Sequence, residues 1–174
     1  MSITMVLSYE LVDEIVNISR VSFEETYGPL SEEQREYQQK QYTADIIRSW
    51  IDNPNMILSV IHNDDKIAGF YLIVLPGGKL ESDIVKDKQA ELGKIYLLGK
   101  FKNIGLGSSL LSHCECICKD RGIKKIYLGV FQGNINAIKF YKKRGFKQSP
   151  RPIMFSRNKR KVINMRMFKK IKNL

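Results

Sequence analysis

The sequence predicts a single α/β domain in which helices and strands share one hydrophobic core. Segments with helical spacing of apolar residues alternate with short β-rich segments along the chain. The chain has 174 residues, 43% of them hydrophobic, which suits one domain with a sizeable core. Because no repeat or low-complexity segment divides the chain, we expect residues 1–174 to form one domain.

The N-terminal part predicts a strand followed by two helices. Residues 3–7 are β-rich, and Ser8 is a candidate N-cap for the helix that follows. That helix is predicted by apolar residues at helical spacing, namely Leu11, Ile15, Ile18 and Val21. Pro29 ends it, and SEEQ from Ser31 is a capping box that predicts a second helix.

The remaining segments predict a hairpin and then alternating strands and helices. β-Rich segments at 56–61 and 66–75 flank HNDDK, which is typical of a hairpin, and PGGK then marks a loop. The later predicted elements are, in order, a strand at 90–98, a helix at 108–121, a strand at 125–130, a helix at 134–144 before Gly145, and a strand at 162–168.

The sequence shows neither a membrane-spanning segment nor a secretion signal. The longest apolar run, IAGFYLIVL at 67–75, is too short to span a bilayer, and the N-terminus lacks the charged start and cleavage site of a signal peptide. We therefore expect a cytoplasmic protein.

The three cysteines lie in CECIC, at Cys114, Cys116 and Cys118. An odd number this closely spaced is no disulfide framework. On a helix Cys114 and Cys118 share a face while Cys116 points elsewhere, which favours buried packing over a metal site. His62 and His113 add no ligand set, so no metal is expected.

Charge is divided along the sequence. The first 120 residues carry 12 basic and 18 acidic side chains, a net charge of −6, whereas residues 121–174 carry 17 basic side chains and no acid. A basic C-terminal part suits nucleic acid or a smaller phosphorylated cofactor, and an acidic part suits a cationic substrate. Solvated faces are the alternative for any single charge.

Gly105 and Gly107 precede a predicted helix and follow a predicted strand. Glycines there let the backbone approach a ligand, and the first N–H groups of the helix would point at an anion such as a pyrophosphate. The known phosphate loops do not fit, because no Gly-Lys-Ser/Thr follows and position 110 is leucine. A plain turn at the start of a helix stays the alternative.

Two longer motifs, found in order, resemble the GNAT superfamily of N-acetyltransferases. IYLLGKFKNIGLGSSLL at 95–111 is similar to its Gln/Arg-x-x-Gly-x-Gly/Ala signature, with Lys102 where the family prefers Gln or Arg. NINAIKFYKKRGF at 134–146 is similar to its Asn-x-x-Ala-x-x-x-Tyr-x-x-x-Gly-Phe signature. The resemblance implies a mixed, twisted sheet flanked by helices, with strands 90–98 and 125–130 splayed to hold acetyl-CoA. The cofactor-binding residues it implies are Tyr96, Leu97, Lys102, Asn103, Ile104, Gly105, Leu106, Gly107, Ser108, Asn134 and Lys143.

The implied reaction moves an acetyl group from acetyl-CoA to a primary amine by direct attack in a ternary complex. An alkylamine, with a pKa near ~10, must be deprotonated before it attacks, and the departing thiolate needs a proton. Tyr141 matches the family's general acid, with core packing beside Phe140 as the alternative reading. Glu91 is the candidate base, with a solvated strand-end glutamate or a relay through waters as alternatives.

The acceptor is implied by a narrower resemblance. SFEETYGPLSEEQ at 22–34 looks most similar to the bacterial spermidine and spermine N-acetyltransferases. Glu24, Glu25 and Tyr27 would then line a site for a polyamine. Glu32 and Glu33 suit a polycation too, but acidic residues are favoured in any first turn of a helix. Other small amines, peptide N-termini and antibiotics stay open as acceptors.

A second function class stays open beside the enzyme. The acid-free stretch, including SRNKRK at 156–161, suits nucleic acid, and a regulator that binds acyl-CoA without turnover is a further alternative. No helix-turn-helix pattern appears, and the aromatics of the tail do not interleave with its basic residues, so nucleic acid is not favoured. A homodimer is expected from the family, with the MRMF strand near the end as the contact.

Overall fold

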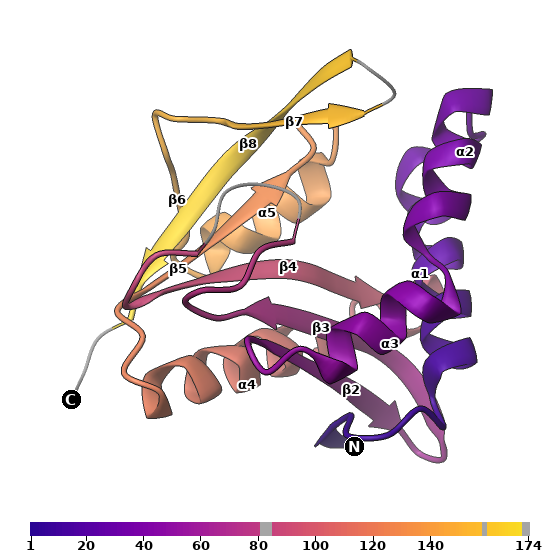
Figure 1. Cartoon of the computed structure of the whole chain (residues 1–174), viewed down its shortest axis with the longest axis horizontal. Helices are drawn as coiled ribbons and strands as arrows, with labels where there is room; N and C mark the ends of the chain where they lie inside the picture. Colours follow the sequence, from indigo (N-terminus) through magenta and orange to yellow (C-terminus); the bar gives the residue numbers. More distant parts are fainter. Residues whose placement is uncertain (81–84, 158–159, 172–174) are drawn as a thin grey trace. The chain divides into compact units, whose positions relative to one another are not determined.

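A computed structural model describes residues 1–80, 85–157 and 160–171, and within these the backbone alone of 153–157 and 160–163 (Figure 1). The chain divides into two compact units. Unit 1 comprises Met1–Ile73 and Lys94–Cys114, and unit 2 comprises Val74–Gly93 and Glu115–Leu174. Strands β3 and β4 and helix α4 run through both units. The single domain expected from the sequence stays a prediction.

Unit 1 holds the N-terminal helices and a meander of strands. Its elements are β1 (Ser2–Met5), α1 (Val12–Tyr27), α2 (Glu32–Gln41), α3 (Ala44–Asp52), β2 (Met56–Asn63), β3 (Lys66–Val74), the last residues of β4 (Gln89–Leu97), the 3-10 helix η1 (Gly99–Phe101) and the start of α4 (Leu106–Asp120). The strand order is β1-β2-β3-β4, with β1 antiparallel to β2. Helix α3 lies beside α1 and against β2 (Figure 1).

The core of unit 1 lies around β3. Every residue of β3 after Lys66 is buried, which explains why this strand reads as a continuous apolar run rather than an alternating one. The largest fully buried side chains around it include Ile15, Ile18, Ile47, Leu58, Ile61, Phe70, Tyr71 and Leu72.

The starts of α1 and α2 test two sequence predictions. The capping box at Ser31 is confirmed: Ser31 Oγ accepts from the Gln34 N–H at 3.2 Å, and Gln34 Oε1 accepts from the Ser31 N–H at 2.9 Å. Ser8 as the N-cap of the first helix is wrong, because α1 begins at Val12 with Leu11 at the cap position and no side-chain cap. Backbone bonds support that turn instead: the Val12 N–H donates to the Tyr9 carbonyl at 3.1 Å, and the Ile15 N–H donates to the Leu11 carbonyl at 2.9 Å.

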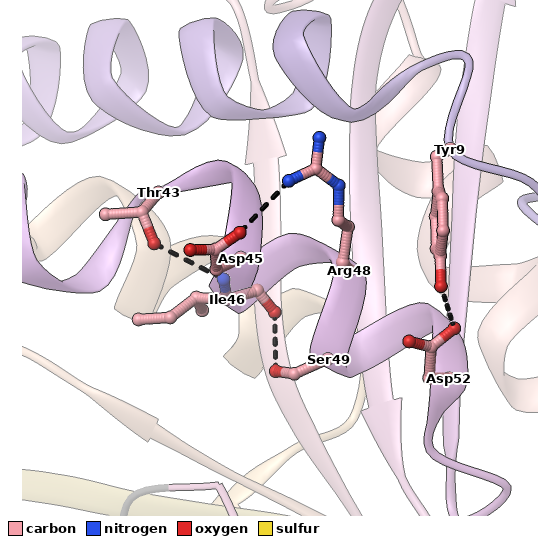
Figure 2. Close-up of polar contacts among 7 residues, drawn as sticks. All are labelled: Tyr9, Thr43, Asp45, Ile46, Arg48, Ser49 and Asp52. Atoms are coloured by element: carbon pink, nitrogen blue, oxygen red, sulfur yellow. Dashed lines mark hydrogen bonds and ion pairs between the residues drawn. The ribbon is translucent and has the colours of Figure 1, made fainter.

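Helix α3 was not predicted from the sequence. Figure 2 shows its start, where Thr43 Oγ1 accepts a hydrogen bond from the Ile46 N–H. Its far end is tied to the β1–α1 loop by Tyr9, whose hydroxyl donates to Asp52 at 2.6 Å. That bond to a carboxylate raises the pKa of Tyr9. Thr43 as an N-cap was the signal that marks this helix.

Unit 2 holds a mixed sheet. Its elements are the first residues of β4, the end of α4, β5 (Lys125–Val130), α5 (Ile135–Lys143), β6 (Lys147–Gln148), β7 (Ile153–Arg157) and β8 (Arg160–Lys170). β5 pairs in parallel with β4 and antiparallel with β8, and β6 and β7 both pair with β8. The expected mixed sheet is therefore confirmed. The short strands β6 and β7 were not predicted, and β8 extends beyond the predicted 162–168.

No helix in the described part of the chain is long and apolar enough to cross a membrane.

Candidate active site

The parallel strands β4 and β5 pair over only a short distance. Their register joins Gln89 with Lys125, Ala90 with Ile126, and Glu91 with Tyr127. Beyond this point β5 continues to Val130 and pairs with β8 alone among the described strands. Beyond Tyr127, the edge of β5 opposite β8 therefore has no strand partner among the described residues. An extended ligand with amide groups is the kind of molecule that such an edge can bind.

Glu91 lies at the last paired position of β4 and is buried, with 6% of the residue exposed. A glutamate is seldom buried unless its environment gives it a partner or a function. The solvated strand-end reading of this residue is therefore excluded.

Tyr141 lies on α5 and is buried to 7% exposure. Its ring packs against Phe140 and Phe146, with centroid distances of 5.4 and 5.6 Å. The alternative interpretation, that Tyr141 packs in the core beside Phe140, is thus confirmed for the ring, and this packing holds the ring in place. Packing of the ring leaves the chemistry of the hydroxyl open, since one end of a tyrosine can be apolar and the other polar.

Asn134 is the N-cap of α5. Its Oδ1 accepts from the Ala137 N–H at 3.1 Å, which gives the first residue of the second motif a structural function. Lys143 lies in the last turn of the same helix, where its side chain is exposed beside Lys142.

The glycine loop of unit 1 precedes α4, which begins at Leu106, two residues before the predicted start. Asn103 and Gly105 have φ angles of 64° and 91°, so the loop adopts left-handed backbone twice. The first bond of the helix ladder runs from the Ser109 N–H to the Gly105 carbonyl at 3.1 Å. The N–H groups of Leu106 and Gly107 therefore lie outside that ladder.

This helix start fits an anion. Gly105 has no side chain to cap the helix, and the first turn contains no acidic residue. A Cβ added to Gly105 would meet no atom within 4 Å, so the space beside it is open. Backbone N–H groups and the helix dipole together favour a phosphate or another anion there.

The end of β4 is in close contact with β3. A Cβ added to Gly69 would lie 2.1 Å from the Tyr96 carbonyl oxygen and 2.9 Å from Leu97 Cα. The Leu98 N–H donates to the Ala68 carbonyl at 3.0 Å just beyond. Gly69 is therefore required for the position of the backbone at Tyr96 and Leu97.

We expect Gly69→Ala to lower the free energy of unfolding by about 1–3 kcal/mol, because the added methyl group overlaps the backbone of β4. Thermal unfolding of the variant and the wild type measures this loss. Equal stability of the two would contradict the close approach of β3 and β4.

The Tyr96 side chain is held by aromatic neighbours. Its hydroxyl and that of Tyr42 lie 2.6 Å apart, and its ring packs edge-on to Phe70 at 5.5 Å. Tyr42 is 1% exposed, and burial raises its pKa well above the usual value. Tyr42 is thus a neutral, structural hydroxyl at neutral pH.

The predicted acceptor residues lie on the last turns of α1. Glu24 Oε1 accepts from Gln38 Nε2 at 3.1 Å, and the ring of Tyr27 lies 4.5 Å from that of Phe23. Glu25 has different partners: its carboxylate accepts from the Gly99 N–H at 3.0 Å and from Lys102 Nζ at 2.9 Å. No sequence signal joins Glu25 to Lys102.

Cys114 and Cys118 are buried and Cys116 is exposed, as the helical spacing predicts. No group of three metal-ligating side chains occurs among the residues that the structure describes. Of the SRNKRK stretch, residues 158 and 159 lie outside the described residues, as do the side chains of the other four.

Together these features define a class: an α/β protein with a short parallel strand pair and a helix start suited to an anion. Residues 12–146 match the model of the acetyltransferase (GNAT) family, and the chain belongs to that family. The motif-based recognition is confirmed, and the chain is an acetyltransferase.

Similar proteins agree with this assignment. Spermidine N(1)-acetyltransferase of Thermoplasma acidophilum is 30% identical over 148 residues, which cover 81% of this chain and 85% of the relative. The crystal structure of PaiA N-acetyltransferase from Thermoplasma acidophilum, in complex with coenzyme A, has a TM-score of 0.77 at 25% identity and covers 98% and 99% of the two chains. Ribosomal-protein-alanine N-acetyltransferase from Brucella melitensis, at 15% identity and a TM-score of 0.74 over 98% and 99% of the chains, shares the fold.

Proposed function

We propose that the protein transfers an acetyl group from acetyl-CoA to a primary amine by direct attack in a ternary complex, with a polyamine as the acceptor. The observation that carries this proposal is the end of the β4–β5 ladder at Glu91 and Tyr127. An opened parallel pair offers backbone hydrogen-bonding groups to the amides of an extended arm.

Acetyl-CoA would supply the activated acetyl thioester. The backbone of Tyr96 and Leu97 is proposed to bind the pantetheine arm, and the glycine loop at 102–108 the pyrophosphate. The open space at Gly105 and the absence of acidic residues from the first turn of α4 support this fit. Asn134 and Lys143 are proposed as further contacts, with Lys143 for the 3′-phosphate.

Two side chains of unit 2 are proposed to move protons. Glu91 accepts a proton from the ammonium group of the amine, directly or through water, so that the nitrogen lone pair can attack the thioester carbonyl. A new C–N bond forms and the C–S bond breaks, and the Tyr141 hydroxyl donates a proton to the leaving sulfur. An N–H group at the end of β4 is proposed to polarise the carbonyl.

We expect Glu91→Gln to lower kcat/KM for the amine about tenfold or more at neutral pH, since a positioned base commonly contributes ~100-fold or more. The variant should regain activity as the pH approaches the pKa of the free amine, because deprotonated acceptor is then abundant. An unchanged pH–rate profile would remove Glu91 from the mechanism.

The polyamine acceptor is supported by two observations. The relative from Thermoplasma acidophilum carries the name spermidine N(1)-acetyltransferase and is similar over most of both chains. In this chain, the exposed carboxylate of Glu24 lies about one helical turn before the half-buried Tyr27 at the end of α1. Carboxylates and an aromatic face are groups that attract an alkylammonium ion.

The acceptor class is tested by thiol release from acetyl-CoA in the presence of spermidine, spermine, an aminoglycoside or a short peptide. We expect polyamines to give the highest kcat/KM, and initial rates with both substrates varied to give intersecting lines, as a ternary complex requires. Preference for a peptide N-terminus would overturn the polyamine assignment, and parallel lines would overturn direct attack.

A further inference from the structure

Glu25 joins helix α1 to the segment that leads into the glycine loop. Its Oε1 accepts from the Gly99 N–H at 3.0 Å, and its Oε2 accepts from Lys102 Nζ at 2.9 Å. All three residues belong to unit 1. The carboxylate therefore contacts both sides of the 3-10 helix η1, at its first residue and immediately after its last.

The backbone at Gly99 leaves room for the Glu25 carboxylate only because residue 99 has no side chain. A Cβ added to Gly99 would lie 2.6 Å from Oε1 and 3.2 Å from Oε2, so any larger residue at 99 would displace the carboxylate. The side chains of Glu25 and Lys102 are 33% and 43% exposed, which leaves them partly shielded from water. Glu24, the preceding residue, has a different partner in Gln38.

The loop that follows is one that needs support. Asn103 and Gly105 both have positive φ, and Ile104 between them is 59% exposed and so contributes little packing. Left-handed backbone is unfavourable for residues other than glycine, although asparagine adopts it more often than most. Helix α4 fixes the far end of this loop, and Glu25 fixes the near end.

We propose that Glu25 is a positioning residue for the pyrophosphate loop rather than a ligand of the amine. By holding the Gly99 N–H and the Lys102 ammonium group, its carboxylate keeps the loop in the conformation that presents the helix N–H groups of Leu106 and Gly107. Its negative charge is offset by the direct ion pair with Lys102, which limits repulsion of a phosphate. This inference rests on the proposed binding of coenzyme A at this loop.

The test compares Glu25→Ala, which loses both contacts, with Glu25→Gln, which keeps an acceptor for the Gly99 N–H but loses the ion pair. Asp45→Asn is the matched control, because it removes an exposed carboxylate that pairs with Arg48 on α3, outside the proposed machinery. Titration calorimetry with coenzyme A gives the dissociation constant directly. Steady-state rates with acetyl-CoA and with S-acetylpantetheine, which lacks the pyrophosphate, give KM for each donor and for the amine.

We expect Glu25→Ala to raise the dissociation constant for coenzyme A about fivefold or more, in keeping with a partly exposed, charge-assisted hydrogen-bond pair. Glu25→Gln should recover part of this loss, and Asp45→Asn should resemble the wild type. The KM values for S-acetylpantetheine and for the amine should change less than about twofold, because neither molecule touches the pyrophosphate loop.

Several results would overturn the inference. Tighter binding of coenzyme A by Glu25→Gln would mean that the carboxylate competes with the phosphates for Lys102. A rise in the KM for the amine alone, or equal losses with both donors, would return Glu25 to the acceptor site or to general stability. If the wild type itself fails to bind coenzyme A, the proposed function is wrong. If the wild type binds coenzyme A and Glu25→Ala binds it equally well, only the inference about Glu25 is wrong.

Discussion

Replacement of Tyr141 by phenylalanine should lower kcat about 100-fold or more while coenzyme A binds as before. The change removes the hydroxyl that is proposed to protonate the leaving sulfur, and general acids commonly contribute a factor of this size. The ring keeps its packing against Phe140 and Phe146, so the fold should be retained. Single-turnover thiol release and calorimetric binding of coenzyme A measure the two quantities separately.

Tyr9→Phe is the matched control for this change. Tyr9 also donates a hydroxyl hydrogen bond, to Asp52, but it lies at the surface on the β1–α1 loop (Figure 2). We expect its kcat to stay within about twofold of the wild type, since surface hydrogen bonds contribute little. If Tyr141→Phe were as active as Tyr9→Phe, water rather than Tyr141 would protonate the thiolate.

Replacement of Gly105 by alanine should raise the dissociation constant for coenzyme A about tenfold or more. The added methyl group meets no protein atom within 4 Å, so it enters the open space proposed for the pyrophosphate. It would displace at least one charge-assisted hydrogen bond, worth roughly 1.5–3 kcal/mol, and 1.4 kcal/mol corresponds to a factor of ten. Calorimetry with coenzyme A measures the change.

Gly122→Ala separates this effect from backbone strain. Gly122 also has a positive φ, 69°, and a Cβ there would also meet nothing within 4 Å, but it lies at the other end of α4. Both variants should lose a similar amount of stability, roughly 1–2 kcal/mol. A weakened affinity in Gly122→Ala equal to that in Gly105→Ala would show that strain, not the phosphate site, is responsible.

The elements that could be predicted from the sequence are those with a strong local signal, such as a capping box or a continuous apolar run. The Ser31 capping box and the strand at Lys125–Val130 agree with the sequence prediction. Helix α3 is only nine residues long, and it was missed although Thr43 caps it and Ile46, Ile47, Trp50 and Ile51 recur at helical spacing. Helix α4 begins before the predicted serine because Gly105, which has no capping side chain, ends the loop.

Only the parts of the candidate site that lie within the two sequence motifs could be placed from the sequence. Both signatures placed the glycine loop and Tyr141 on the expected elements. Burial of Glu91 and the close approach at Gly69 depend on packing between strands, which no single segment encodes. The pair of Glu25 and Lys102 joins residues 77 positions apart, and it arises only when α1 and the β4–α4 connection fold together.

Transfer of the acetyl group itself tests the central claim most directly. Acetyl-CoA with a radiolabelled acetyl group is incubated with the protein and spermidine, and the label is followed in amine, acetate and protein while free thiol is counted. The account predicts label in the amine in equal amount to the thiol released, with neither product formed by Tyr141→Phe at the wild-type rate. Thiol release with the label in free acetate, or binding without release, would contradict it.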